Sequence, residues 1–531
     1  MTAGGMATSD VLKHSRVSRY WVGGGTVVLL VLVGTGLYLL KAHAEPILRE
    51  RVTETLATHF HGRVEMSGFH VWVEDGLAVS GEGLRIYGKT DPNIHEPGVQ
   101  PLIGVEEFRF QTGLLSLLRS PMHVHSVRLR GLVLNIPPGG QREEMQGMEP
   151  KHGKIRIIVD EFVSQDAQLI INTSRADKLP LEFSIQDLRM EDVGTGQPIH
   201  FDATLLNPRP VGEIASSGFF GPLQLDHPRD TPVKGTYSFS HADLATIRGI
   251  AGILSSKGEY SGSLGSIVVN GKTETPNFRL TVSGHAVPLT TEFHAIVDGT
   301  TGNTYLEPVS ARVLNSSFVA RGSVLRFKPQ GHEVKLNVAI NNARIEDLLR
   351  LGMRTEPPVM DGAVSSDARL DLPPGPEEVD KRLRLSGEFE IGGAHFSNPK
   401  MQERIDGLSA RSLGKPKLAT GKDMGDVLST LSGTFDLKQG VMDFSRLHFA
   451  VPGTEVDMTG KYSLDGDTFD FYGKVRLNAK LSQLVTGWKS VLLKPADPFF
   501  AKNGAGTELP IKISGTKSEP HIGPDFGHKG K

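Results

Sequence analysis

The feature that most constrains the fold is an alternation of apolar and polar side chains with a period of two residues. It starts after Arg63, where residues 64–73 form the first run. The clearest later runs are Val127 and Leu129; Ile155, Ile157 and Val159; Val334, Leu336, Val338 and Ile340; Leu383, Leu385, Gly387, Phe389 and Ile391; Val456, Met458, Gly460, Tyr462 and Leu464; and Phe469, Phe471, Gly473, Val475 and Leu477. This period places every apolar side chain of a strand on one face. Asp-Gly or Asn-Gly pairs, which favour hairpin turns, occur at 75–76, 270–271, 298–299, 361–362 and 465–466. The pattern predicts a mainly β chain of antiparallel strands with one apolar face.

A short repeat adds curvature to this prediction. The order glycine, any residue, aromatic, any residue, apolar begins at Gly235, Gly387, Gly433 and Gly460, with a looser copy at Gly473. Glycine at the start of a strand permits a bulge or a sharp bend. Repeated bends predict a long curved sheet that forms a groove, trough or solenoid more readily than a flat sandwich.

A few short helices are expected to cap this sheet. Helical spacing of apolar residues occurs at 45–60, 240–254, 344–353, 401–413 and 481–493. In the first stretch, Leu48, Val52, Leu56 and Phe60 form one stripe. We expect that helix to cap the first strands, and a helix lying along a membrane surface is the alternative.

The N-terminal region contains an uncharged apolar run from Trp21 to Leu40. About 20 such residues are what a helix needs to cross a bilayer. Lys13, Arg16 and Arg19 precede the run, so the N-terminus is expected in the cytoplasm and the rest of the chain on the far side of the membrane. The residues expected to anchor this single transmembrane helix are Trp21, Val27, Leu30, Leu32, Leu37 and Leu40.

A cleaved signal peptide is the alternative for this run. Ala42, His43 and Ala44 fit a small-x-small cleavage site. The anchor is favoured because the full apolar run exceeds the usual signal-peptide core of about 7–15 residues. Both alternatives export the bulk of the chain.

The domain prediction follows from these segments and from proline-rich breaks near 228–232 and 373–376. The predicted divisions are a cytoplasmic N-terminus at 1–19, a transmembrane helix at 20–41, an N-terminal β-domain at 45–230, a middle β-repeat region at 231–380 and a C-terminal β-domain at 381–531.

Composition excludes several classes of function. Lys and Arg number 58 against 60 Asp and Glu, so no basic excess favours nucleic acid. Cysteine is absent, which removes disulfides, thiolate chemistry and cysteine-based metal sites. A hydrophobic share of 38% with 61 glycines and 32 prolines is typical of a folded, turn-rich chain.

No motif in the sequence predicts catalysis, a cofactor or a metal. Residues 83–90 match the phosphate-loop pattern, but Leu84 and Ile86 have strand spacing inside the motif and Pro92 follows it, so a strand and a turn are favoured. The His-x-His pairs at 59/61 and 123/125 have no third ligand in the sequence. The acidic residues at 465, 467 and 470 lack the later ligands of a calcium loop. The chain is therefore not expected to be an enzyme.

Three segments carry a resemblance to a known family. The run PILRERVTETLATHFHGRVEMSGFHVWVEDGLAVSGEGLRIYG after the apolar segment resembles the start of AsmA-like proteins, and GTYSFSHADLATIRGIAGILSSKGEYSGSL also fits. The tail from Leu431 to Gly515 is similar to the C-terminal region of the AsmA/DUF748 group of Gram-negative envelope proteins. The resemblance implies an inner-membrane anchor, a periplasmic domain, a relation to repeating β-groove proteins that carry lipids, and links to outer-membrane assembly and to regulation of protein targeting to membranes.

Together these features predict a protein anchored in the inner membrane that binds or conducts phospholipid, or another acyl lipid, for outer-membrane biogenesis. The alternative is a non-enzymatic assembly factor that engages other envelope proteins and regulates their targeting or insertion. The residues predicted to face lipid are Val334, Leu336, Val338, Phe389, Phe435, Leu437, Met458, Tyr462, Phe469, Phe471, Val475 and Leu477.

Overall fold

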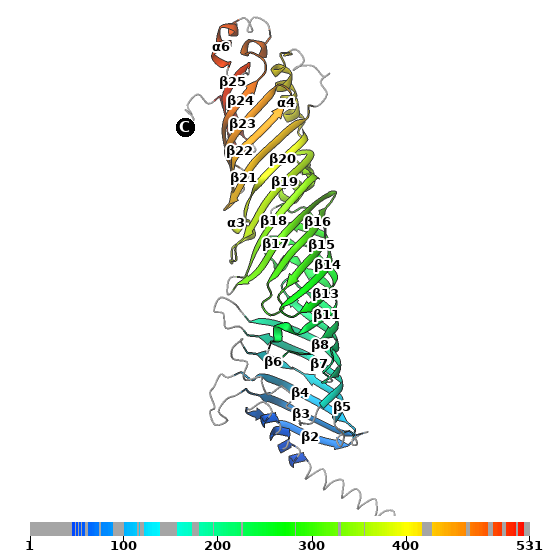
Figure 1. Cartoon of the computed structure of the whole chain (residues 1–531). Coiled ribbons are helices and arrows are strands. Elements are labelled where there is room, and N and C mark those ends of the chain that lie inside the picture. The colour runs from blue at the N-terminus through cyan, green and yellow to red at the C-terminus, as the bar shows by residue number, and fades with distance from the viewer. Residues whose placement is uncertain are drawn as a thin grey trace, which may run out of the picture. The chain divides into compact units, whose positions relative to one another are not determined.

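A computed structural model gives the architecture of the chain (Figure 1). It describes residues 45–47, 49–50, 52–54, 56–58, 62–73, 76–88, 100–113, 116, 122–137, 157–172, 180–194, 196–224, 227–281, 283–327, 331–354, 356–416, 427–463, 468–486, 492–501, 506–516 and 519–524. The predicted transmembrane helix at 20–41, with all its anchor residues, lies outside these ranges. Within them, no helix combines the length and the apolar character needed to span a bilayer.

The chain is mainly β, as predicted, and divides into two compact units. Unit 1 comprises residues 1–136, 140–168 and 189–195, and unit 2 comprises residues 137–139, 169–188 and 196–531. The finer predicted boundaries at 230/231 and 380/381 stay predictions.

Unit 1 is a mixed sheet. Its strands are β1 (Val64–Glu65), β2 (Gly68–Val73), β3 (Leu77–Ile86), β4 (Ile103–Thr112), β5 (Met122–Arg130), β6 (Val133–Ile136) and the first part of β7 (Ile157–Ile171). Strands β1 to β6 pair antiparallel through β3 and β4. Strand β7 pairs parallel with β5, so the expectation of a purely antiparallel sheet is wrong here. The reason is that β5 and β6 both lie along β4, so the chain reaches β7 through a crossover and not through a hairpin.

A helical segment covers the apolar face of unit 1. Phe69, Val71, Val79, Val105 and Phe108 form a buried cluster, and Val52 of the helical residues 45–58 packs against it. The Arg49 side chain also donates to the Met66 carbonyl at 2.7 Å. The predicted cap on the first strands is therefore present. In the phosphate-loop-like motif, residues 83–86 belong to β3, as predicted, and the last two residues of the motif lie outside the described ranges.

Unit 2 is an antiparallel ladder. Its strands are β9 (Ile199–Pro208), β10 (Val211–Phe220), β11 (Pro232–Asp243), β12 (Ile250–Ala251), β13 (Ile253–Ser263), β14 (Ser266–Leu280), β15 (Val287–Val297), β16 (Thr304–Val313), β17 (Ser316–Phe327), β18 (Gly331–Arg344), β19 (Met360–Leu372), β20 (Arg384–Phe396), β21 (Ser429–Lys438), β22 (Val441–Val451), β23 (Thr454–Ser463), β24 (Thr468–Leu477), β25 (Thr507–Thr516) and β26 (Pro520–Pro524); residues of β8 (Leu181–Val193) divide between the units. Apart from the short β12, each strand from β9 onward pairs antiparallel with the next (Figure 1).

The short helices of unit 2 mostly connect strands at one long edge of this ladder, which we call the covered edge. They are the 3-10 turn η4 (Leu244–Thr246), α2 (Ile345–Gly352), α4 (Pro399–Ser412), the 3-10 turns η6 (Leu481–Leu484) and η7 (Lys494–Ala496), and α6 (Asp497–Phe500). We call the opposite strand ends the open edge; α3 (Val379–Arg382) and the 3-10 turn η3 (Pro228–Asp230) connect strands there. In Figure 1, α4 and α6 lie at one end of strands β20–β25 and α3 lies at the other.

The helices predicted at 344–353 and 401–413 are present as α2 and α4. The helix predicted at 240–254 is wrong, because β11 continues to Asp243 and only the single turn η4 follows. Gly249 and Gly252 have positive φ angles of 98° and 133°, which turn the chain directly into the next strands. The helix predicted at 481–493 is also wrong at its start, where η6 ends at Leu484 and Val485 is extended.

Candidate functional site

Strand register brings all the predicted lipid-facing residues onto one face of unit 2. Directly paired residues of neighbouring strands point to the same side of a sheet. One such row runs Leu336, Leu370, Leu385, Leu437, Met442, Tyr462 and Phe469. A second row runs Val338, Ala368, Gly387, Phe435, Phe444, Gly460, Phe471 and Ile513. The remaining predicted residues, Val334, Phe389, Met458, Val475 and Leu477, occupy the same side in adjacent rows. We call this side of β9–β25 the apolar face.

The apolar face is almost free of charge. Among the paired positions that the structure describes on β9–β25, the side that carries these residues holds no Asp, Glu or Lys. Its one arginine is Arg326, paired with His332 where β17 and β18 end at the open edge. The positions in between form the opposite, polar face, which carries the charged side chains of these strands.

Burial on the apolar face varies from one edge to the other. At the covered edge, Ala343, Val364, Ile391 and Ala394 are buried in a cluster that Ile345 and Leu348 of α2 help to close. Val451 and Leu477 are buried at the same edge. Toward the open edge, Val334, Tyr462 and Phe469 keep part of their surface exposed. The gradient has exceptions, since Val233 and Leu437 are buried although they lie near the open edge.

Most of the predicted lipid-facing side chains are therefore only partly buried, and Leu437 and Leu477 are fully packed at 4% exposure each. The main strand contacts within the described part of unit 2 are with ladder neighbours, and helices contact the sheet at β14, β19, β20, β23 and β25. The middle of the apolar face thus belongs to a single layer of sheet.

Phenylalanine rings form a connected row along this face. Ring centroids are 6.1 Å apart for Phe389 and Phe435, 6.4 Å for Phe389 and Phe444, 5.8 Å for Phe444 and Phe471, and 6.4 Å for Phe469 and Phe471. The glycines of the sequence repeat make room for these rings, because a Cβ on Gly433 would lie 3.0 Å from the Phe389 ring. The repeat therefore lets aromatic rings lie against the sheet surface.

The β10–β15 part of the apolar face carries hydroxyl groups that the sequence analysis did not identify. Tyr260 and Ser216 hydroxyls lie 2.7 Å apart, Tyr237 and Ser256 hydroxyls lie 3.0 Å apart, and Thr273 and Thr291 hydroxyls lie 2.7 Å apart. Burial raises the pKa of Tyr237 and of Tyr260, and the hydrogen bond from each partner serine offsets part of that rise. Both tyrosines are therefore neutral near pH 7.

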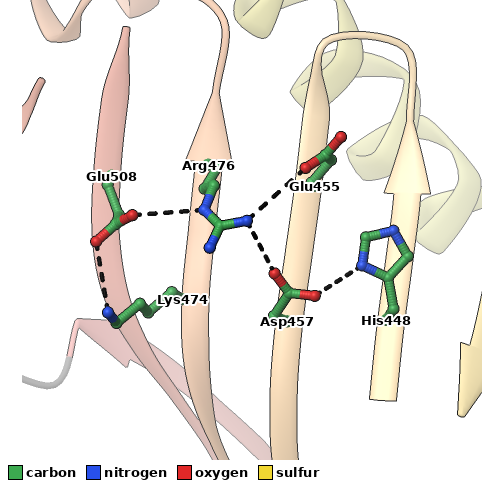
Figure 2. Close-up of polar contacts among 6 residues, drawn as sticks. All are labelled: His448, Glu455, Asp457, Lys474, Arg476 and Glu508. Carbon is green, nitrogen blue, oxygen red and sulfur yellow. Dashed lines mark hydrogen bonds and ion pairs between the residues drawn. The ribbon is translucent and has the colours of Figure 1, made fainter. Parts of the chain in front are cut away.

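The polar face of the same strands is held by cross-strand ion pairs, as Figure 2 shows for β22–β25. Asp457 accepts from His448 Nδ1 at 2.7 Å and pairs with Arg476 at 3.2 Å. Arg476 also approaches Glu455 at 4.0 Å and Glu508 at 3.4 Å, and Lys474 pairs with Glu508 at 3.6 Å. These residues alternate along their strands with Val456, Val475 and Leu509, so the two faces of one strand differ completely in polarity.

A hollow of about 1160 Å³ lies mainly on the polar face of β17–β22, not on the apolar face. Its polar lining includes Arg321, Asn337, Arg369, Glu388, Asp436 and Asp443. In unit 1, His123 and His125 both approach Asp160, at 3.1 and 3.6 Å, although the sequence offered no third partner. The described residues contain no group of three or more His, Asp or Glu side chains that could hold a metal ion.

Two apolar members of this face depart from the two-residue period. Phe444 and Leu447 both lie on it, although they are three residues apart, because the register shifts between them. A bulge adds a residue and reverses the parity of everything beyond it.

Comparison of the chain with protein-family models, with curated proteins and with solved structures found no match in any of the three.

Proposed function

We propose that the protein binds acyl lipid along the apolar face of unit 2 and conducts it as part of cell-envelope, outer-membrane biogenesis. The single observation that carries the proposal is the continuity of that face, which at its described paired positions runs over β9–β25 with Arg326 as its one charged side chain. At about 4.8 Å per strand this is a path on the order of 70 Å. Such a surface suits hydrocarbon, since each methylene kept out of water is worth about 0.8 kcal/mol.

The burial gradient across the apolar face supports entry of an acyl chain from the open edge. Helices and turns close the covered edge, whereas partly exposed apolar residues continue to the open edge. An acyl chain can therefore approach the phenylalanine row from the open edge while its polar end stays near water. The proposed function needs no catalytic group, metal or cofactor.

The resemblance to AsmA-like proteins and the apolar run at 21–40 support the location of this activity. We infer a single-pass protein of the inner membrane whose larger part lies in the periplasm of a Gram-negative envelope. The membrane and its phospholipid are then the first partners.

Photocrosslinking from adjacent positions of one strand tests the proposal. A benzophenone amino acid replaces Phe435 or Phe471 on the apolar face, and Asp436 or Tyr472 on the polar face. After irradiation in cells, mass spectrometry of the purified full-length protein should find lipid adducts at Phe435 and Phe471 and far fewer at their neighbours. Equal labelling of both faces, or no lipid at any position, would overturn the proposal.

One observation favours a second function, that of a non-enzymatic assembly factor for other envelope proteins. The hollow on the polar face of β17–β22 offers both charge signs, with Arg321 and Arg369 beside Glu388 and Asp443, and such a lining suits a polar protein surface. This function predicts protein adducts from Asp436 in the same experiment, together with the absence of lipid adducts from Phe435.

A further inference from the structure

Arg326 is an anomaly on the apolar face. It is the one arginine at a described paired position of that side of β9–β25, and it lies at the open edge beside its cross-strand partner His332. Its backbone N–H donates to Asn303 Oδ1 at 3.2 Å, which fixes the strand but leaves the guanidinium unengaged by that bond. A positive charge at the rim of an uncharged face attracts an anion, and no described carboxylate pairs with this one.

Within the part of the chain that the structure describes, the charged groups nearest to Arg326 are cations or carboxylates that already have a partner. The pKa of His332 is lowered, first by its partial burial and then by the positive charges of Arg326 and Arg209. The acidic groups of neighbouring turns are already engaged, because Asp298 pairs with Arg229 at 3.0 Å and Glu333 pairs with Lys335 at 2.8 Å. Among the described residues, Arg209 and Arg326 have no ion pair.

We propose that Arg326 and His332 bind the phosphate of a phosphorylated acyl lipid whose chains lie on the apolar face. This inference rests on the proposed function and narrows it to one class of lipid. A guanidinium offers paired donors that match phosphate oxygens, and the neutral imidazole of His332 adds one N–H donor. The charge of Arg209 adds positive electrostatic potential at His332. Hydrocarbon would then extend from the open edge over Val324 and Val334, which pair next to Arg326 and His332 on the same side.

The experiment offers the detergent-solubilised full-length protein an equimolar mixture of dioleoyl phosphatidic acid and dioleoylglycerol, which differ only in the phosphate. Native mass spectrometry measures the ratio of the two bound lipids. The wild-type protein should retain the phosphate-bearing lipid at least about tenfold better, as expected for hydrogen bonds to a charged group. Arg326→Gln should lower the ratio about tenfold, and His332→Gln about threefold, without reducing dioleoylglycerol binding.

Arg369→Gln is the matched control, because Arg369 lies on the polar face of β19 and should leave the ratio unchanged. Arg326→Gln keeps the backbone bond to Asn303, so an unchanged circular-dichroism melting curve will verify folding. A wild-type ratio near one, or a preference that survives Arg326→Gln, would overturn the headgroup site. Failure of both lipids to bind would instead overturn the proposed function itself.

Inorganic phosphate, added alone in large excess, distinguishes a lipid headgroup from free phosphate. It should leave the lipid ratio unchanged because it brings no acyl chain to the apolar face. Loss of the preference under this competition would assign the site to free phosphate and contradict the lipid assignment.

Discussion

Units 1 and 2 share the alternating pattern, but its apolar face is buried in unit 1 and partly exposed in unit 2. In unit 1 a helical segment packs on the apolar face, and Phe69 and Phe108 are only 4% and 7% exposed. In unit 2 the helices close the covered edge alone, and Phe389, Phe435 and Phe471 stay partly exposed in a single layer. An apolar face is therefore a core or an accessible surface according to what covers it, and the period of the sequence does not decide between the two.

The largest expected difference between the units comes from placing a carboxylate on each face. Val79→Asp puts a charge at a position that is 2% exposed, so unit 1 should lose on the order of 4 kcal/mol and unfold locally. Phe471→Asp places the same charge on the partly exposed phenylalanine row, so unit 2 should keep its strands and lose its bound lipid. Hydrogen exchange with mass spectrometry measures strand protection, and lipid extraction measures occupancy.

Thr459→Asp is the control for charge alone, because Thr459 is exposed on the polar face of the neighbouring strand β23, opposite Tyr472. It should leave lipid occupancy unchanged. If Phe471→Asp instead abolishes protection throughout β21–β25, the apolar face of unit 2 is a closed core and the comparison fails.

The two-residue period predicted which residues share a face wherever strands are regular. Phe435, Phe471 and Val338 were placed correctly because antiparallel register preserves parity from strand to strand. It could not place Phe444 with Leu447, because the bulge between them is a backbone event with no residue type reserved for it. Helix spacing misled at 244–254 because glycines at 249 and 252 and pairing with neighbouring strands override a weak local preference.

The polar side chains of the apolar face could not be predicted from the sequence for a different reason. Tyr237, Tyr260 and Thr291 are polar by composition, so their positions were not identified as part of an apolar face. Arg326 belongs to that face only through its pairing with His332, two residues beyond the apolar pair of Val324 and Val334. Accessibility of the face was also unpredictable, since it depends on where helices from distant segments pack.

The next largest effect concerns the helix that closes the covered edge of unit 2. Asp347 of α2 is 4% exposed and accepts from the Asn315 N–H at 3.0 Å and the Ser316 hydroxyl at 2.9 Å. Asp347→Ala removes the acceptor of both donors, of which the Ser316 hydroxyl is buried, and should destabilise the edge by about 2 kcal/mol. Hydrogen exchange should rise in α2 and in the turn between β16 and β17.

Asp347→Asn retains one acceptor oxygen and should have a smaller effect on the same peptides. If Asp347→Ala leaves hydrogen exchange in α2 unchanged, this carboxylate does not hold α2 against the sheet. The burial of Ala343 and Val364 then needs another explanation.

A smaller difference is expected from adding one methyl group under a ring in each unit. A Cβ on Gly81 would meet the buried Phe108 ring at 2.3 Å and the Gly68 carbonyl at 2.4 Å. A Cβ on Gly433 would meet the Arg446 carbonyl at 2.7 Å and the partly exposed Phe389 ring at 3.0 Å. Phe108 has no room to move beneath the helical segment, so Gly81→Ala should cost about 2 kcal/mol. Gly433→Ala should cost about 1 kcal/mol less, because its backbone contact is longer than that of Gly81 and because Phe389 can turn outward. Equal losses of hydrogen-exchange protection in β3 and β21 would contradict the conclusion that a helical segment covers the apolar face in unit 1 but leaves that of unit 2 accessible.

The smallest effect tests how the open edge of unit 2 is held without helical cover. Asp298, in the turn between β15 and β16, accepts from the Thr300 N–H at 2.9 Å and the Thr300 hydroxyl at 2.6 Å and pairs with Arg229. Burial raises the pKa of Asp298, but hydrogen bonds from Thr300 and Thr301 and the charge of Arg229 outweigh it, so the pKa lies below its ordinary value.

A carboxyl group whose pKa is lower in the folded state stabilises the fold above its unfolded pKa of about 4, and that stability disappears as the pH falls through the folded value. Asp298→Asn should therefore lower the free energy of unfolding by about 1 kcal/mol at pH 7, with the difference from wild type fading toward zero as the pH falls through the folded pKa of Asp298. Denaturant titrations of both proteins across this pH range measure the difference. Asp230→Asn, beside Arg229 on the exposed η3 turn, is the control and should show no such trend. A constant deficit at every pH would mean that the turn is stabilised by the shape of the Asp298 side chain and not by its charge.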